Sequence, residues 1–156
     1  MEFTHLDENG QANMVNVGEK DVTVRTASAL AKVRMQPETL QKLLASELKK
    51  GDALAAARIA GIMAAKKTWE LIPLCHNIPI DSVNIDFTDN GVDELSVIST
   101  LRCTYRTGIE MEALTAVSVA ALTVYDMCKA IDRGMTIEEI RLLKKTGGRH
   151  DYRYEG

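Results

Sequence analysis

The sequence predicts an α+β fold, and three observations support this class. Strand-like stretches alternate apolar and polar residues, whereas Leu- and Ala-rich stretches show helical spacing. The elements follow in the order strand, helix, helix, hairpin, helix, helix, without an internal repeat. A chain of 156 residues that is 46% hydrophobic accommodates one domain with a proper core. We therefore expect a single domain over 1–156.

The predicted elements can be placed along the chain. They are a strand over 21–35, helices over 37–50 and 53–69, paired strands over 81–89 and 95–107, a helix over 110–132 and a short helix over 137–145. The polar segments at the two ends, about 1–20 and about 145–156, are expected to be flexible.

The first strand and the two helices after it have clear local signals. Val22 and Val24 begin an alternating β-branched pattern. Pro37 suits the first position of a helix, which Gly51 should end. Asp52 can then cap the second helix, so residues 51 and 52 form a corner between the two.

The hairpin is predicted from alternation on both sides of a turn. Val83, Ile85 and Phe87 share one face of the first strand, and the sequence NGVDE turns the chain. The middle of the strand over 95–107 is out of phase, so we expect a bulge there.

The helix over 110–132 is apolar almost all round between Ala113 and Tyr125. Such a helix must be covered on more than one side, which favours a subunit interface in addition to the sheet. Its 13 most apolar residues are fewer than the roughly 17–25 that span a membrane. Gly134 ends the helix, and Thr136 is expected to cap a final short helix.

Charge and cysteine content exclude several classes. The formal net charge of -3 provides no general attraction for nucleic acid or an anionic membrane. The three cysteines are an odd number without a CxxC pair, which fits free thiols in a reducing cytoplasm. The N-terminus lacks the basic and apolar regions of a signal peptide. We expect a cytoplasmic protein.

The stretch WELIPLCHNIPI places Cys75 and His76 between two prolines. Neighbours in an extended segment point to opposite sides, and no other Cys or His lies at ligand spacing, so zinc is disfavoured. Cys75 is interpreted as a structural thiol. A rigidly held histidine can serve as an acid or base, although a structural histidine is an equal alternative.

Charged residues at both ends of the long helix are further candidates. Glu110 and Glu112 at its start can simply favour the positive end of the helix dipole. Asp126 and Lys129 are three residues apart and so share a face, either as a salt bridge or as catalytic groups. Lys50 and the tail KKTGGRHDYR can be solvated, or can contact an anionic ligand.

Three long motifs resemble a known family. The stretches ARIAGIMAAKKTWELIPLCHNIPI, TGIEMEALTAVSVAALTVYDMCKAID and RLLKKTGG are similar to those of molybdenum cofactor biosynthesis protein C, the cyclic pyranopterin monophosphate synthases. The resemblance implies a ferredoxin-like antiparallel sheet packed against helices, and a homo-hexamer built as a trimer of dimers. It also implies a lyase that converts 3',8-cyclo-7,8-dihydro-GTP, supplied by a radical partner enzyme, to cyclic pyranopterin monophosphate and pyrophosphate during molybdopterin biosynthesis.

The resemblance also assigns site residues by motif. The implied catalytic residues are Lys50, His76, Glu110, Glu112, Asp126 and Lys129. The implied substrate contacts are Leu74, Cys75, His76, Met111 and Glu112. The resemblance implies no cofactor and no protein-bound metal, although Mg²⁺ can accompany the triphosphate.

Helix length predicts that two chains share one site. A continuous helix would separate Glu112 from Asp126 by about 21 Å, which is too far for one small substrate. Either the glutamates fold back in a loop, or two subunits combine their residues. A different class of function remains as an alternative, a non-catalytic oligomeric module that binds nucleotides or phosphates, and a metal-binding module is a third.

Overall fold

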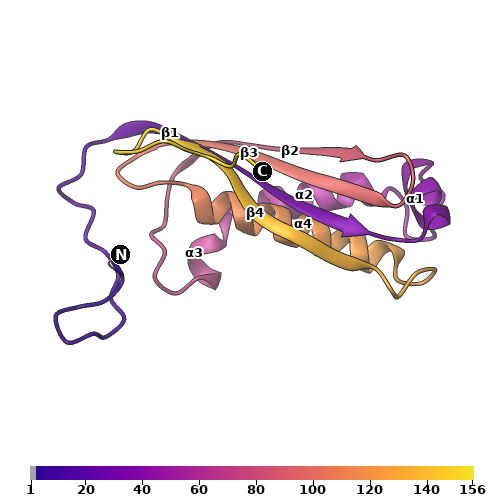
Figure 1. The fold of residues 1–156 in the computed structure, drawn as a ribbon, viewed down its shortest axis with the longest axis horizontal. Helices are drawn as coiled ribbons and strands as arrows, with labels where there is room; N and C mark the ends of the chain where they lie inside the picture. Colours follow the sequence, from indigo (N-terminus) through magenta and orange to yellow (C-terminus); the bar gives the residue numbers. More distant parts are fainter. Residues whose placement is uncertain (1–2) are drawn as a thin grey trace.

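The computed structural model describes residues 3–156 and contains a mixed series of helices and strands (Figure 1). In chain order they are β1 Thr23–Arg34, α1 Pro37–Leu44, α2 Ala53–Lys66, α3 Thr68–Leu71, β2 Ile80–Asp89, β3 Glu94–Tyr105, α4 Glu110–Cys128, β4 Thr136–Thr146 and β5 Tyr152–Arg153. The α+β class expected from the sequence is confirmed.

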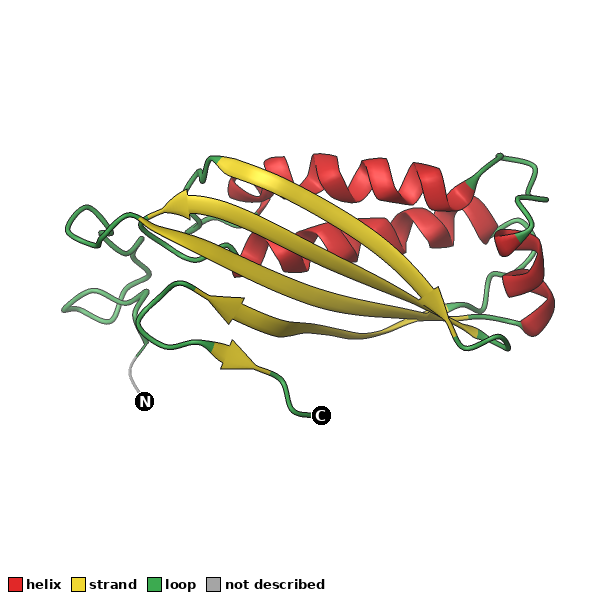
Figure 2. Cartoon of the chain, turned by 90° about the horizontal axis from the view of Figure 1, so that it is seen from above, coloured by secondary structure: helices red, strands yellow, loops and turns green. Residues whose placement is uncertain are grey.

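The strands form one antiparallel sheet in the order β2-β3-β1-β4-β5. The helices α2 and α4 lie side by side on one face of this sheet, and α1 lies at one end of it (Figure 2). Without β5, the succession β1, α2, β2, β3, α4, β4 and the strand order correspond to a ferredoxin-like arrangement. This agrees with the resemblance found in the sequence.

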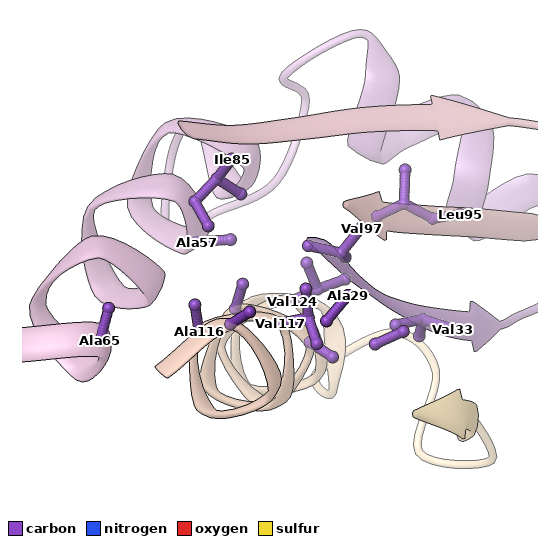
Figure 3. Packing of buried hydrophobic residues seen from close by; sticks show 14 of the residues in the cluster. Ala29, Val33, Ala57, Ala65, Ile85, Leu95, Val97, Ala116, Val117 and Val124 are labelled. Carbon is purple, nitrogen blue, oxygen red and sulfur yellow. The ribbon is translucent and has the colours of Figure 1, made fainter. Parts of the chain in front are cut away.

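Small residues let the two long helices approach closely over the sheet. The inward positions of β1 alternate as Ala27, Ala29, Ala31 and Val33, all buried. A methyl group added at Gly61 in α2 would lie 3.0 Å from a carbonyl oxygen of α4. The core between the layers is built largely from alanines and valines, which Figure 3 shows in place. Close backbone packing therefore fixes α4, the helix that carries the candidate residues.

The predicted short helix over 137–145 is wrong, because these residues form the strand β4. β4 pairs with β1 along most of its length, and two register shifts interrupt the pairing. Ile137 and Leu142 pack against the core. Without β4, the edge of β1 would keep unpaired backbone groups over the core, so sheet pairing overrides the weak local helical spacing.

Smaller differences from the expected elements have local causes. α1 ends at Leu44 because the chain turns at Ser46, whose φ is 57°. The predicted helix over 53–69 is divided at Lys67 into α2 and α3. Asp52 caps α2 as expected, since its side chain accepts a hydrogen bond from the N–H of Ala55 at 3.1 Å.

The expected bulge in the middle of the second hairpin strand is absent. β3 pairs with β1 without interruption, and the irregularity in the hairpin lies near Ile80 in β2. Ser99 occupies the core-facing position at which a polar residue interrupts the apolar alternation of the sequence. Its hydroxyl donates to the carbonyl oxygen of Ala113 at 2.9 Å, which satisfies a buried polar group.

The helix α4 begins at the predicted residue but ends at Cys128, before the predicted end at 132, and it is longer than the apolar stretch from Ala113 to Tyr125. With 19 residues it is long and apolar enough to cross a membrane by length and composition alone. In the fold its inner side packs on the sheet and on α2, while Leu122 stays exposed. Ile59 and Met63 of α2 are also exposed. Cover of this outer side by a second subunit stays a prediction.

Residues in both terminal segments take part in β-type backbone pairing. Leu6 and Ala12 form an isolated bridge, and the short β5 pairs with Lys144 and Lys145 of β4. The expected flexibility of the two ends stays a prediction.

Candidate active site

A cluster of three charged side chains lies at the C-terminal end of α4. Asp126 lies between two lysines: its Oδ2 is 3.0 Å from Nζ of Lys50, and its Oδ1 is 2.8 Å from Nζ of Lys129. Each of the three side chains is about half exposed. Hydrogen bonds from Lys129 and then Lys50 hold the pKa of Asp126 below its usual range, and Asp126 in turn raises the pKa of Lys129. Asp126 and Lys129 are therefore both ionised at neutral pH.

Local chain geometry brings Lys50 to this cluster. The chain reverses between α1 and α2 at Gly51, whose φ of 96° favours glycine. Asp52 then caps α2, which fixes the corner beside α4. Asp126 and Lys129 meet because residues three apart share a helix face. An ion pair, one of the two interpretations given for Asp126 and Lys129, is present, and Lys50 joins it from a distant part of the chain.

Two glutamates lie at the opposite end of the same helix. Glu112 is only 3% exposed, and this burial, reinforced by the charge of Glu110, raises its pKa to about 7. Oε1 of Glu110 lies 2.8 Å from Nζ of Lys145 in β4. The angles of this contact are those of an ion pair and do not fit a hydrogen bond. Oε1 is therefore a buried acceptor without a hydrogen-bond donor among the described residues.

The segment with Cys75 and His76 lies between α3 and β2. Leu74, Cys75 and His76 are half-buried, as is Met111 in the first turn of α4. Burial, followed by the charges of Glu112 and Glu110, raises the pKa of the Cys75 thiol. Cys75 therefore lies near the two glutamates and stays a thiol at neutral pH, as a wall residue would and a nucleophile would not.

We expect the stability of the protein to depend on pH through Glu112. Its pKa rises from 4.5 to about 7 on folding, so the native state retains a proton that the unfolded chain has lost. The free energy of unfolding should therefore fall as pH rises through this window. The variant Glu112→Gln lacks this titrating group, so its free energy of unfolding should not fall in this window. Above pH 8 it should be more stable than the wild type by up to about 3 kcal/mol.

Urea unfolding at pH 5 and pH 8 measures this difference. Glu70→Gln, which changes an exposed glutamate in α3, serves as the control and should follow the wild type at both values. An equal pH dependence in wild type and Glu112→Gln would mean that Glu112 titrates as an ordinary surface glutamate.

A cavity of about 750 Å³ opens beside Glu110. Its charged and titratable lining residues are Glu19, Lys20, Asp21, Arg25, Glu110, Lys145, Arg149 and His150. Four of these are cationic lysines or arginines, which suits an anionic ligand.

Arg25 was not among the residues predicted from the sequence, and Lys145 was predicted only as part of the C-terminal tail. Arg25 is buried, and its Nε donates to the carbonyl oxygen of Tyr105 at 3.1 Å. Its position in β1 is in phase with Ala27 and Ala29, which face the core. A charged residue at a strand position that faces the core is costly unless it has partners, and this was the signal that could have revealed Arg25.

Three glycines line this cavity, Gly108, Gly147 and Gly148. Gly147 has a φ of 95°, and an added methyl group would lie 2.1 Å from the carbonyl oxygen of Val24. We expect Gly147→Ala to lower the free energy of unfolding by about 1–3 kcal/mol, because both the backbone and the contact are strained.

Gly91→Ala is the matched control for this change. Gly91 also has a positive φ, of 75°, but an added methyl group meets nothing within 4 Å. Chemical denaturation of the two variants should show a larger loss for Gly147→Ala, and equal losses would contradict the steric argument.

The structure brings the candidate residues into two groups and keeps the groups apart. Lys50, Asp126 and Lys129 lie at one end of α4, and Glu110, Glu112 and the Cys75 segment lie at the other. The helix is continuous from Glu110 to Cys128. Glu112 and Asp126 are therefore separated by about 21 Å. Of the two arrangements left open by the sequence, the one with the glutamates in a loop is wrong.

The described residues 3–156 contain no group of three or more His, Cys, Asp or Glu side chains placed to hold a metal ion. In particular, Cys75 and His76 have no further ligands around them.

Comparison with known proteins gives a consistent result. The model of the MoaC family matches residues 14–148. A cyclic pyranopterin monophosphate synthase of Herpetosiphon aurantiacus is 60% identical over 154 residues, which cover 97% of this chain and 94% of the relative. Proteins of the same name from Chloroflexus aurantiacus and a Roseiflexus species are 57% and 58% identical over 149 residues. These alignments cover 95% of this chain, and 91% and 94% of the relatives respectively.

Proposed function

The chain belongs to the MoaC family, and from this membership we propose that it is a cyclic pyranopterin monophosphate synthase. The proposed reaction is the conversion of 3',8-cyclo-7,8-dihydro-GTP to cyclic pyranopterin monophosphate with release of pyrophosphate. It is a lyase reaction of molybdenum cofactor biosynthesis. The observation that supports it best is the carboxylate of Asp126 held between two lysine ammonium groups.

This cluster suits a rearrangement that moves protons without electron transfer. Opening a purine ring, closing a pyrazine ring and forming a cyclic phosphate require positioned acids and bases. An ionised carboxylate can accept a proton, and a neighbouring ammonium can donate one or stabilise negative charge. Lys50, Asp126 and Lys129 are proposed as this group. His76, Glu110 and Glu112 are proposed as further catalytic residues.

Glu112 complements the ionised cluster with a second kind of carboxyl group. With a pKa of about 7, it is partly protonated at neutral pH, whereas Asp126 is ionised. Carboxyl groups whose surroundings move their pKa values apart can serve as acid and base in one reaction. We assign the donor role to Glu112. Leu74, Cys75 and Met111 are proposed as substrate contacts in the wall beside it.

The triphosphate is proposed to bind in the cavity beside Glu110. Lys20, Arg25, Lys145 and Arg149 line this cavity and can neutralise phosphate charge. Mg²⁺ accompanying a triphosphate needs only one or two protein carboxylates, which Glu19 and Asp21 can provide. Bound there, the ion would shield the charge of the phosphates.

A complete site is proposed to form between two subunits. Each chain carries the group with Asp126 at one end of α4 and the group with Glu112 at the other end. A partner subunit whose α4 ran antiparallel to the first would place its Glu112 group beside the Asp126 group of the first chain. The exposed Ile59, Met63 and Leu122 suit such an interface. We propose a hexamer built as a trimer of dimers. The protein is further proposed to be cytoplasmic and to receive its substrate from a radical enzyme.

Supplying the purified protein with 3',8-cyclo-7,8-dihydro-GTP tests the function directly. We expect cyclic pyranopterin monophosphate and pyrophosphate in equal amounts. Tight binding of the substrate without product would instead favour a regulatory module that binds nucleotides or phosphates, which uses the same lysines. Elemental analysis of the purified protein tests the third alternative, a metal-binding module.

A further inference from the structure

A buried carboxylate lies just beyond α4 and outside both residue groups. Asp132 is 7% exposed. Its Oδ2 accepts hydrogen bonds from the backbone N–H of Gln36 at 2.8 Å and from the hydroxyl of Thr39 at 3.0 Å. Its Oδ1 accepts one from the N–H of Gly134 at 3.2 Å. Asp132 thus joins the turn after α4 to the start of α1.

This carboxylate replaces the missing cap of α1. Gln36 occupies the N-cap position, but its side chain makes no capping hydrogen bond. The first N–H groups of a helix need an acceptor, and a negative charge there also favours the helix dipole. Asp132 provides both from a part of the chain 96 residues away.

The opposite end of α1 leads to the ionised cluster. Beyond Leu44 the chain turns and reaches Lys50, which contacts Asp126. The segment from Gln36 to Lys50 is therefore attached to the end of α4 at two points, through Asp132 and through Asp126.

The turn that carries Asp132 is itself held in place. The hydroxyl of Tyr125 donates to the carbonyl oxygen of Arg133 at 3.0 Å, and the N–H groups of Ile131 and Asp132 donate to the carbonyl oxygen of Cys128. A displacement of α1 relative to α4 would have to break the contacts of Asp132, because the turn cannot follow easily.

We propose that Asp132 is a positioning residue that fixes α1 against the end of α4, so that Lys50 reaches Asp126. It does not contact the substrate. Its importance for turnover rests on the proposed function, but its effect on the geometry of the cluster does not.

Titration of the Asp126 carboxyl group, followed by carbon-13 NMR, tests this role without any substrate. The charged groups beside this carboxylate are Lys50 from the corner before α2 and Lys129 from the C-cap of α4. In Asp132→Ala, Lys50 should withdraw, and the pKa of Asp126 should rise toward its ordinary value. Asp132→Asn, which keeps one acceptor oxygen and the side-chain size, should give a smaller rise and protects the test against misfolding of the alanine variant.

Asp7→Asn is the matched control. Asp7 also accepts backbone hydrogen bonds, at 2.9 Å from the N–H groups of Asn9 and Gln11, but it lies in the N-terminal segment. This change should leave the Asp126 titration unaltered. An unaltered titration in both Asp132 variants, even with a lower melting temperature, would reduce Asp132 to a stabilising cap and overturn the proposal.

Turnover provides the second measurement. If the proposed function holds, kcat should fall about tenfold in Asp132→Ala with a smaller change in KM, because a small misplacement of a catalytic group is costly. Absence of turnover in the wild type would reject the proposed function and leave the NMR test of Asp132 intact. A kcat of Asp132→Ala equal to that of an active wild type would reject its positioning role.

Discussion

Asp126→Asn is expected to bind the cyclised GTP substrate and to convert it about 10²- to 10⁴-fold more slowly than the wild type. The amide keeps the size of the side chain but cannot take a proton at neutral pH. It also leaves Nζ of Lys50 and of Lys129 without their anionic partner. Single-turnover measurement of product formation, together with calorimetric binding, separates the chemical step from affinity.

The same variant distinguishes an enzyme from a phosphate-binding module. In a module that only binds anions, the carboxylate opposes the ligand, so Asp126→Asn should bind more tightly and there is no turnover to lose. Lys129→Ala should lose turnover in parallel with Asp126→Asn. Asp86→Asn, which changes an exposed carboxylate on β2, should retain wild-type rates. Retention of the wild-type kcat in Asp126→Asn would exclude this carboxylate from the chemistry.

Most of the fold could be predicted because its signals are local. Alternation placed β1 and the hairpin, Pro37 and Asp52 began their helices, and the apolar run gave α4. The strand β4 could not be found in this way. Its residues resemble a short amphipathic helix, and only the unpaired edge of β1, which no local pattern reveals, makes them a strand.

The candidate site shows the same division between local and distant information. The spacing of Asp126 and Lys129 predicted their contact, since Asp126 lies in the last turn of α4 and Lys129 is the C-cap residue that continues its helical backbone. Lys50 was assigned by family resemblance, and its contact with Asp126 depends on how α1 and α2 are joined. The raised pKa of Glu112 depends on burial, which the first turn of a helix does not by itself determine. Residues that meet through tertiary packing are those for which the sequence alone was insufficient.

The separation of the two residue groups has a direct consequence for mixed oligomers. If each substrate contacts Glu112 from one chain and Asp126 from another, then Glu112→Gln and Asp126→Asn damage different halves of the same site. A site is intact when it takes Glu112 from an Asp126→Asn chain and Asp126 from a Glu112→Gln chain. In a random 1:1 mixture, about one quarter of the sites should be of this kind, because each half is drawn independently.

Mixing the two inactive variants should therefore restore activity to about one quarter of the wild-type value per site. The variants are denatured and refolded together so that subunits exchange, and each variant refolded alone serves as the control. A mixture of Lys129→Ala with Asp126→Asn is the matched negative, because these residues contact each other in one chain, 2.8 Å apart, and no intact half can form. If the first mixture stays as inactive as the second, although mass spectrometry shows mixed oligomers, the interfacial site is wrong. Each chain would then have to bring its two residue groups to the substrate by itself, against the 19-residue helix that holds them apart.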